Sequence, residues 1–159
     1  MVTKKRTIRT IPQQRTSVRE QDPMQRVKNF AEVNCAYSIE DALKESERCL
    51  FCPEQPCVAG CPVNIDIPAF IREISANNFR GAYDVIVASN LLAAVCGRVC
   101  PQESQCEGVC LRGRKGKSVA IGALERYVAD WAQQHPEVLQ HAVPTPTGRT
   151  IAVVGSGPA

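Results

Sequence analysis

The sequence predicts an all-α fold of short helices, and three observations lead to this expectation. Helix-starting signals recur along the chain, and apolar residues follow them at helical spacing. No segment before residue 150 alternates apolar and polar residues with the period of two that a half-buried strand needs. Aromatic residues make up only 5% of the 159 residues, so we expect metal–thiolate bonds to replace part of the usual apolar core.

The expected helices follow in order along the chain. Asp22 is the N-cap of a helix over 23–30, with Pro23 tolerated in its first turn. Ser38 and Asp41 form a capping-box pattern, with Asp in place of the usual Glu, for a helix that reaches about residue 49. Asp66 caps the next segment, whose apolar face consists of Ile67, Phe70, Ile71 and Ile74. Two further helices are expected over 79–89 and 119–134, the second with the inward stripe Ile121, Leu124, Val128 and Trp131.

Eight of the nine cysteines fall into two runs, and this is the strongest chemical signal in the sequence. The first run is Cys49, Cys52, Cys57 and Cys61, which precedes Pro62, and the second is Cys96, Cys100, Cys106 and Cys110. Residues 1–22 are basic and contain no apolar signal segment or membrane span, so we expect a cytoplasmic protein. Disulfides are disfavoured in that reducing compartment, which leaves metal binding.

Zinc and iron–sulfur clusters are the two candidates for these thiols. Four thiolates suit tetrahedral zinc, and a structural zinc module without redox activity is therefore an alternative. Structural zinc sites usually combine two short segments that each supply two ligands, such as Cys-x2–4-Cys. Here each run holds four closely spaced cysteines, and the first run ends in Cys-Pro, as in bacterial ferredoxins. The spacing therefore favours iron–sulfur clusters.

Glu125 is the most informative residue outside the cysteines, because it lies beside the apolar stripe of the last expected helix. A buried glutamate is costly unless it is paired or ligated. The residues alone favour a salt bridge to Arg126, Arg98 or Lys117. Gly122, within the same helix, indicates the close approach of another group.

Several motifs together resemble the N-terminal domain of the glutamate synthase small (beta) chain. The motifs include Arg48-Cys49-Leu50, Cys61-Pro62-Val63, Ile65-Asp66-Ile67-Pro68, Cys96-Gly97-Arg98-Val99-Cys100-Pro101, Cys106-Glu107 and Val119-Ala120-Ile121-Gly122. The resemblance covers residues 23–159 and extends to dihydropyrimidine dehydrogenase and to flavin-bifurcating ferredoxin:NADP oxidoreductases. It implies an alpha-helical ferredoxin domain with two [4Fe–4S] clusters.

The resemblance also implies how the two runs share the clusters. Carried onto this sequence, the first cluster has the ligands Cys49, Cys52, Cys57 and Cys110. The second has Cys61, Cys100, Cys106 and Glu125, because family members place Glu or Gln at this last position. Cys96 is then an unligated neighbour, and Cys35 lies outside both runs.

The last residues carry the start of a second motif. Residues 150–154 are expected to form a buried strand, followed by Gly155 and Gly157 of an incomplete Gly-x-Gly-x-x-Gly fingerprint for FAD or NAD(P). We therefore expect four parts: a flexible basic arm over 1–22, the ferredoxin domain over 23–135, a linker over 136–149, and the opening of a truncated FAD/NAD(P)-binding domain over 150–159.

The resemblance implies an electron-transfer role in a longer NAD(P)H-dependent flavoprotein. Its partners would be the FAD/NAD(P)H-binding domain of the same full-length chain and a glutamate synthase large subunit, or alternatively ferredoxin or a pyrimidine-specific site. The net charge of +3, without a basic stripe interleaved with aromatics, argues against nucleic acid. No catalytic constellation is visible, as expected where cofactors carry the chemistry.

Overall fold

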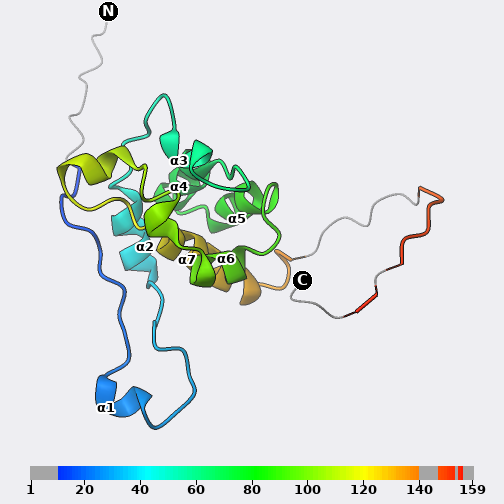
Figure 1. Cartoon of the computed structure of the whole chain (residues 1–159), viewed down its shortest axis with the longest axis horizontal. Helices are drawn as coiled ribbons and strands as arrows, with labels where there is room; N and C mark the ends of the chain where they lie inside the picture. Colours follow the sequence, from blue (N-terminus) through cyan, green and yellow to red (C-terminus); the bar gives the residue numbers. More distant parts are fainter. Residues whose placement is uncertain (1–10, 140–146, 153, 156–159) are drawn as a thin grey trace, which may run out of the picture.

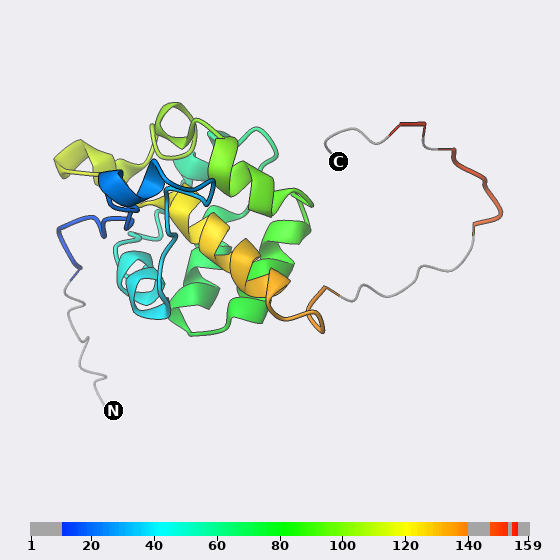
Figure 2. The same cartoon turned by 90° about the horizontal axis from the view of Figure 1, so that it is seen from below.

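A computed structural model describes residues 11–139, 147–152 and 154–155 of the chain. Within these residues all regular structure is helical, and the only strand-like feature is an isolated bridge between Glu20 and Asn34. Figures 1 and 2 show the helices gathered into one body from which a loop bearing α1 projects. The elements are α1 (Pro23–Arg26), α2 (Ile39–Ser46), α3 (Pro56–Ala59), α4 (Ile67–Ser75), α5 (Phe79–Val87), α6 (Ala93–Val99), η1 (Gln102–Ser104), η2 (Leu111–Lys115) and α7 (Ile121–Gln133). No helix in the described part of the chain has the length and apolar character needed to cross a membrane.

Helix α7 is the centre of this arrangement, and α2, α5 and α6 all pack against it. Leu124 and Val128 are fully buried, as the expected stripe requires, while Trp131 is only partly buried and stacks on His135 with ring centroids 4.2 Å apart. Tyr127 meets Phe79 of α5 edge to face, with centroids 5.3 Å apart. The helix predicted over 119–134 is confirmed, with its ends one or two residues inside the expected bounds.

Two buried carboxylates satisfy the N-terminus of α7. Glu45 Oε1 accepts a hydrogen bond from the backbone N–H of Ala120 at 2.8 Å, and Glu107 Oε1 accepts one from Gly122 at 3.2 Å. The first N–H groups of a helix have no partner within it, and their partial positive charge favours anionic groups. These bonds fix two earlier segments to α7. One is α2, which carries Glu45, and the other is the segment after Cys106, which begins with Glu107.

The local helix-start signals are confirmed at α2 and α4. Ser38 Oγ accepts from the N–H of Asp41, whose carboxylate accepts from the N–H of Ser38, so the capping box is complete. The Asp66 side chain caps α4 by accepting from Ala69 at 3.0 Å. The apolar face predicted for α4 is buried. The helix predicted over 79–89 is α5, which ends two residues earlier.

Two helix bounds differ from the expectation, and four short elements, α3, α6, η1 and η2, were not expected. Helix α1 ends at Arg26 rather than Phe30, because Val27 and Phe30 are exposed by 75% and 109% and no core extends so short a helix. Helix α2 ends at Ser46, and tighter turn bonds from Arg48 and Cys49 close it. Helix α6 was not expected, since it is short and contains a glycine.

The predicted flexible arm over 1–22 contacts the domain in its described part. The N–H of Thr16 donates to Glu45 Oε2 at 2.7 Å, and the Tyr37 hydroxyl donates to the carbonyl of Thr16 at 2.6 Å. Arg15 Nη1 lies 2.6 Å from Glu107 Oε2. Burial, followed by the neighbouring Glu45 carboxylate, raises the pKa of Tyr37 well above its ordinary value. Residues 11–22 are thus bonded to the helices, and residues 1–10 lie outside the described residues.

The strand expected over 150–154 is not confirmed. Its described residues, 150–152 and 154, have no strand assignment, and a single strand without a hydrogen-bonding neighbour cannot form a ladder. Gly155 has φ +99°, a conformation that favours glycine. Gly157 lies outside the described residues, so the nucleotide fingerprint remains a prediction.

Candidate functional site

The four cysteines expected to share the first cluster line one pocket. Cys49 follows α2, Cys52 precedes α3, Cys57 lies on α3, and Cys110 directly precedes η2. The remaining wall is largely apolar and includes Ile67, Pro68 and Ile71 of α4, Val119, and Ile121 of α7. The structure therefore brings Cys110 of the second run beside three cysteines of the first.

Burial in this pocket affects the protonation of its thiols. Burial, followed by the neighbouring Cys49 and Cys110, raises the pKa of Cys57 to about 12. A thiol with such a pKa keeps its proton at neutral pH until a metal ion displaces it. Because Cys49 and Cys110 both contribute to the raised pKa of Cys57, each of them lies close enough to interact electrostatically with Cys57.

The buried polar pair Glu45 and Arg48 positions the two chain segments that carry the first group of cysteines. Both side chains are fully buried, and Arg48 Nη1 lies 2.5 Å from Glu45 Oε1. Arg48 also donates to the carbonyls of Ser118 at 3.0 Å and Lys117 at 2.5 Å. Because Arg48 precedes Cys49 directly while 117–118 follow η2, the pair holds both chain segments that supply the thiols. We call this group of contacts the Glu45–Arg48 hub.

The second expected group also converges, around the α6–α7 contact. Burial raises the pKa of Cys106 to about 12, with smaller contributions from Glu107, Cys61 and Glu125. Burial likewise raises the pKa of Cys100 to about 11, with contributions from Cys96, Glu125 and Cys61. Cys61, Cys100, Cys106 and Glu125 are therefore electrostatic neighbours, although they come from three separate parts of the chain.

Glu125 is buried, with 7% of its surface exposed, and has no cationic partner among the described residues. Its Oε1 accepts a hydrogen bond from Asn90 Nδ2 at 2.9 Å, and burial raises the pKa of the carboxyl to about 7. Arg98 and Arg126, the partners that the residues alone favoured, instead form ion pairs with Glu32 and Asp130. The salt-bridge interpretation of Glu125 is thus wrong for these two arginines, and Lys117 forms no ion pair with it either.

The two remaining cysteines lie differently. Cys96, on α6, is half-buried and its Sγ lies 3.7 Å from Asn90 Oδ1, next to the second group. Cys35 is exposed in the loop that bears α1, and its thiol donates to the carbonyl of Val33 at 3.8 Å. Only Cys96 is therefore placed to compete with Glu125 as a ligand.

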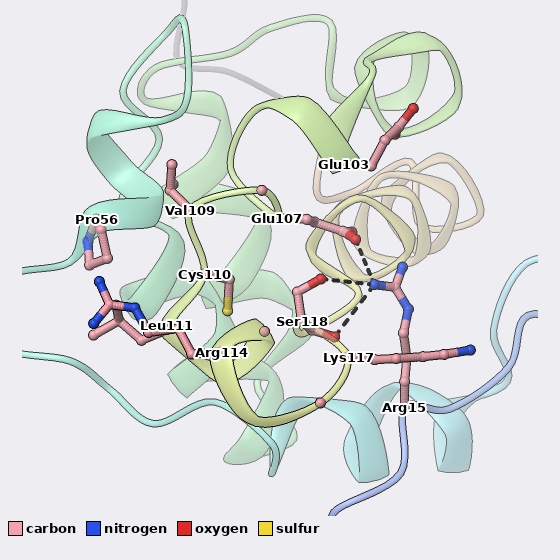
Figure 3. A pocket seen from close by; sticks show the side chains of 13 residues that line it. Arg15, Pro56, Glu103, Glu107, Val109, Cys110, Leu111, Arg114, Lys117 and Ser118 are labelled. Atoms are coloured by element: carbon pink, nitrogen blue, oxygen red, sulfur yellow. Dashed lines mark hydrogen bonds and ion pairs between the residues drawn. The ribbon is translucent and has the colours of Figure 1, made fainter.

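A larger pocket of about 870 Å³ borders the first group, and Cys110 is part of its wall (Figure 3). Arg15 crosses it to contact Glu107 and lies 3.3 Å from Ser118 Oγ. Lys117 and Arg114 of the basic segment after Cys110 also line this pocket. The Cys110 side of the first group thus faces a polar, partly basic opening.

The thiols and the carboxylate of the two groups fit iron–sulfur clusters better than single metal ions. No three His, Cys, Asp or Glu side chains within the described ranges lie close enough to share a single metal ion. A four-iron cluster gives each ligand its own iron and so joins donors that are farther apart. Soft thiolates in an apolar pocket suit iron–sulfur clusters, and a single carboxylate is a harder donor that changes charge and potential.

Comparison with known families decides the chemistry. A family described as dihydropyrimidine dehydrogenase domain II, 4Fe-4S cluster, matches residues 26–137, well over half of the chain. The chain belongs to this 4Fe-4S domain family. The match confirms the suspected family, and it supports iron–sulfur binding over the structural zinc module.

Individual relatives of this 4Fe-4S domain are parts of larger oxidoreductases. The NAD-dependent dihydropyrimidine dehydrogenase subunit PreT of Escherichia coli K12 is 41% identical over 129 residues, which cover 80% of this chain and 31% of the relative. The glutamate synthase [NADPH] small chains of Halomonas elongata and Azospirillum brasilense are 37% and 34% identical, over 84% and 85% of this chain and 28% of each relative. The chain thus spans less than a third of the length of these curated relatives.

Sequence reasoning missed the polar residues that position the ligands of the 4Fe-4S domain. The Glu45–Arg48 hub has no local signature, since its partners are backbone atoms far along the chain. Asn90 carries a weak signal, because asparagine is typical of turns in which its side chain accepts from the backbone N–H two residues on. The close approach that Gly122 indicated is made by the Gln102 side chain, which lies 2.4 Å from where a Cβ would stand.

Proposed function

We propose that residues 23–135 form a two-cluster electron-transfer domain of a longer NAD(P)H-dependent flavoprotein. The observation that carries the proposal is the single apolar pocket lined by Cys49, Cys52, Cys57 and Cys110. This set joins both cysteine runs, as the crossed ligation of the family requires. Bound [4Fe–4S] clusters supply one-electron transfer at potentials set by their ligands and surroundings.

The second cluster of the proposal has the ligands Cys61, Cys100, Cys106 and Glu125. The burial of Glu125 without a cation supports this assignment, because iron would provide the positive charge that the carboxylate lacks in the protein. Only one of its oxygens is engaged by a described residue, which leaves the other available to a metal. Cys96 remains a neighbouring thiol.

The chain's own residues then have three tasks. The apolar walls exclude water from the first cluster, and the Glu45–Arg48 hub holds the segments that carry its thiols. The packing of α6 against α7 brings Cys100 to Glu125. In the longer cytoplasmic protein, the domain would carry electrons between FAD, which NAD(P)H reduces, and a partner subunit.

Metal analysis with ligand variants tests this proposal. Anaerobically prepared protein should contain iron and acid-labile sulfide in equal amounts, sufficient for two four-iron clusters. Cys57→Ser and Cys106→Ser should each lose cluster absorbance and solubility, whereas Cys35→Ser should behave like the unsubstituted protein. Zinc without sulfide would overturn the redox function. Cluster loss in Cys96→Ser with two intact clusters in Glu125→Ala would show that Cys96, and not Glu125, is the eighth ligand.

The electron acceptor has two candidates. A glutamate synthase large subunit is the first, since two relatives are small chains of that enzyme. The second candidate is a dihydropyrimidine dehydrogenase partner, which is supported by the higher identity to PreT, 41% against 37% and 34%. Native purification of the full-length assembly, followed by NAD(P)H oxidation assays with 2-oxoglutarate plus glutamine or with a pyrimidine, distinguishes them.

A further inference from the structure

Asn90 links the two side chains that compete for the last ligand position. It lies in the connection between α5 and α6 and is only 6% exposed. Its Nδ2 donates to Glu125 Oε1 at 2.9 Å, while its Oδ1 accepts from the N–H of Leu92 at 3.0 Å and lies 3.7 Å from Cys96 Sγ. One buried amide thus contacts a helix start, a carboxylate and a thiol.

The orientation of this amide is fixed by its partners. Reversing it would set the NH₂ group against the N–H of Leu92 and the carbonyl oxygen against the Glu125 carboxylate, so both contacts would become repulsive. The backbone N–H at residue 92 therefore determines that Asn90 presents a donor to Glu125. Because Asn90 Oδ1 can only accept, the contact with Cys96 makes the thiol the donor.

We propose that Asn90 is a positioning residue that selects Glu125 over Cys96 as the ligand of the second cluster. Its Nδ2 holds Glu125 Oε1, so that the side chain keeps one rotamer and Oε2, to which no described residue donates, is the oxygen left for iron. Its Oδ1 accepts from the Cys96 S–H, so the thiol is bonded to the amide. This inference rests on the proposed ligand set, in which Glu125 binds the cluster.

A purely structural role for Asn90 is the competing explanation, since its Oδ1 also accepts from the N–H of Leu92 and so orders the turn that leads into α6. Asn90→Asp separates the two roles. Aspartate keeps an oxygen for the N–H of Leu92 and forms such side-chain turns as asparagine does, but it replaces the donor with a second carboxylate oxygen facing Glu125. A role in the turn alone predicts a neutral substitution, and the positioning role predicts a disturbed second cluster.

Asn78 provides a matched control elsewhere in the fold. Its Oδ1 accepts from the N–H of Gly81 at 3.1 Å, and its Nδ2 donates to Glu73 Oε2 at 2.7 Å. Asn78→Asp therefore makes the same chemical change at an exposed helix start, where the partners of the asparagine are Gly81 and Glu73 and not a cysteine. A rescue variant combines Asn90→Asp with Glu125→Gln, because the glutamine NH₂ can then donate to the new aspartate while its carbonyl oxygen remains for iron.

The experiment uses electron paramagnetic resonance and redox titration of the cluster-loaded, reduced chain. We expect Asn90→Asp to shift or abolish the signal of one cluster and leave the other unchanged, Asn78→Asp to match the unsubstituted protein, and the rescue variant to recover both signals. Equal signals in Asn90→Asp and Asn78→Asp would overturn the positioning role while the ligand set stands, provided that Glu125→Ala loses one cluster. Two unchanged clusters in Glu125→Ala would overturn the ligand assignment and this inference together.

Discussion

Replacing Arg48 by methionine removes the cation of the Glu45–Arg48 hub and leaves a carboxylate fully buried. The side chains of both residues are 0% exposed. Glu45 keeps the N–H groups of Thr16 and Ala120 as hydrogen-bond donors, at 2.7 and 2.8 Å. Those two bonds satisfy the polarity of the carboxylate but do not neutralise its charge. The carbonyls of residues 117 and 118 lose their guanidinium donor as well.

The expected loss of stability is large for a single substitution. Breaking a buried ion pair by removing one partner costs about 3–5 kcal/mol. With a urea dependence of about 2 kcal/mol per molar, this loss lowers the midpoint of unfolding by about 1.5–2.5 M. The surface pair Arg80 and Asp84 serves as control, because it is about half exposed on both sides and Arg80→Met should cost no more than about 0.5 kcal/mol.

The assay is urea unfolding of the cluster-loaded protein under anaerobic conditions, followed by far-ultraviolet circular dichroism for the helices and by visible absorbance for the clusters. The double variant Glu45→Gln with Arg48→Met should recover part of this loss, because no uncompensated charge remains buried. The recovery is incomplete, since the glutamine NH₂ group cannot accept from one of the N–H groups of Thr16 and Ala120. Equal midpoints for Arg48→Met and Arg80→Met would show that the hub does not hold the domain. Equal midpoints for the single and double variants would show that charge burial is not the cause.

Three further predictions concern packing, pH and metal. Gly97→Ala should destabilise the domain by about 1–3 kcal/mol, measured by the same urea midpoint, because the new Cβ would lie 2.8 Å from the backbone of Arg126 and force α6 from α7. Tyr37→Phe should cost about 1–3 kcal/mol at pH 8 through the unpaired Thr16 carbonyl, and Tyr83→Phe should not. Since burial raises the folded pKa of Tyr37 above its ordinary value of 10.0, its stabilisation is complete below pH 10 and is lost progressively as the pH rises further, so the midpoints of Tyr37→Phe and of the unsubstituted protein should approach each other above pH 10. Removal of iron and sulfide by a chelator should abolish most helical dichroism, and an unchanged spectrum would contradict a structural role for the clusters.

The parts of the fold that the sequence predicts are those with local causes. Helices α2 and α4 begin at Ser38 and Asp66 because each cap bonds to an N–H only three residues away. Helix α6 has no such cap, and Gly97 makes it a weak helix on its own. It is stabilised by its contact with α7, which no local pattern contains. Tertiary packing therefore determines α6, which the sequence analysis did not predict.

The cysteines of the candidate site were predictable, whereas their polar supports were not. The resemblance assigns Cys110 to the first group, and the structure places it in a pocket with the other three cysteines of that group. Glu125 stood out because a carboxylate beside an apolar stripe needs a partner. The identity of that partner, Asn90, depends on how the α5–α6 connection lies against α7, and a separation of 35 residues carries no local signal.

Helix α7 connects the two candidate clusters through consecutive turns. Ile121 lines the pocket of the first group, and Glu125, four residues later, belongs to the second. Four residues of an α-helix rise by about 6 Å, so the helix fixes the separation between the two sites to within one turn. Glu45 and Glu107 hold the N-terminus of this helix, which prevents a shift of register relative to both cysteine runs. Because electron transfer weakens steeply with distance, the buried carboxylates stabilise not only the fold but also the spacing on which the proposed relay depends.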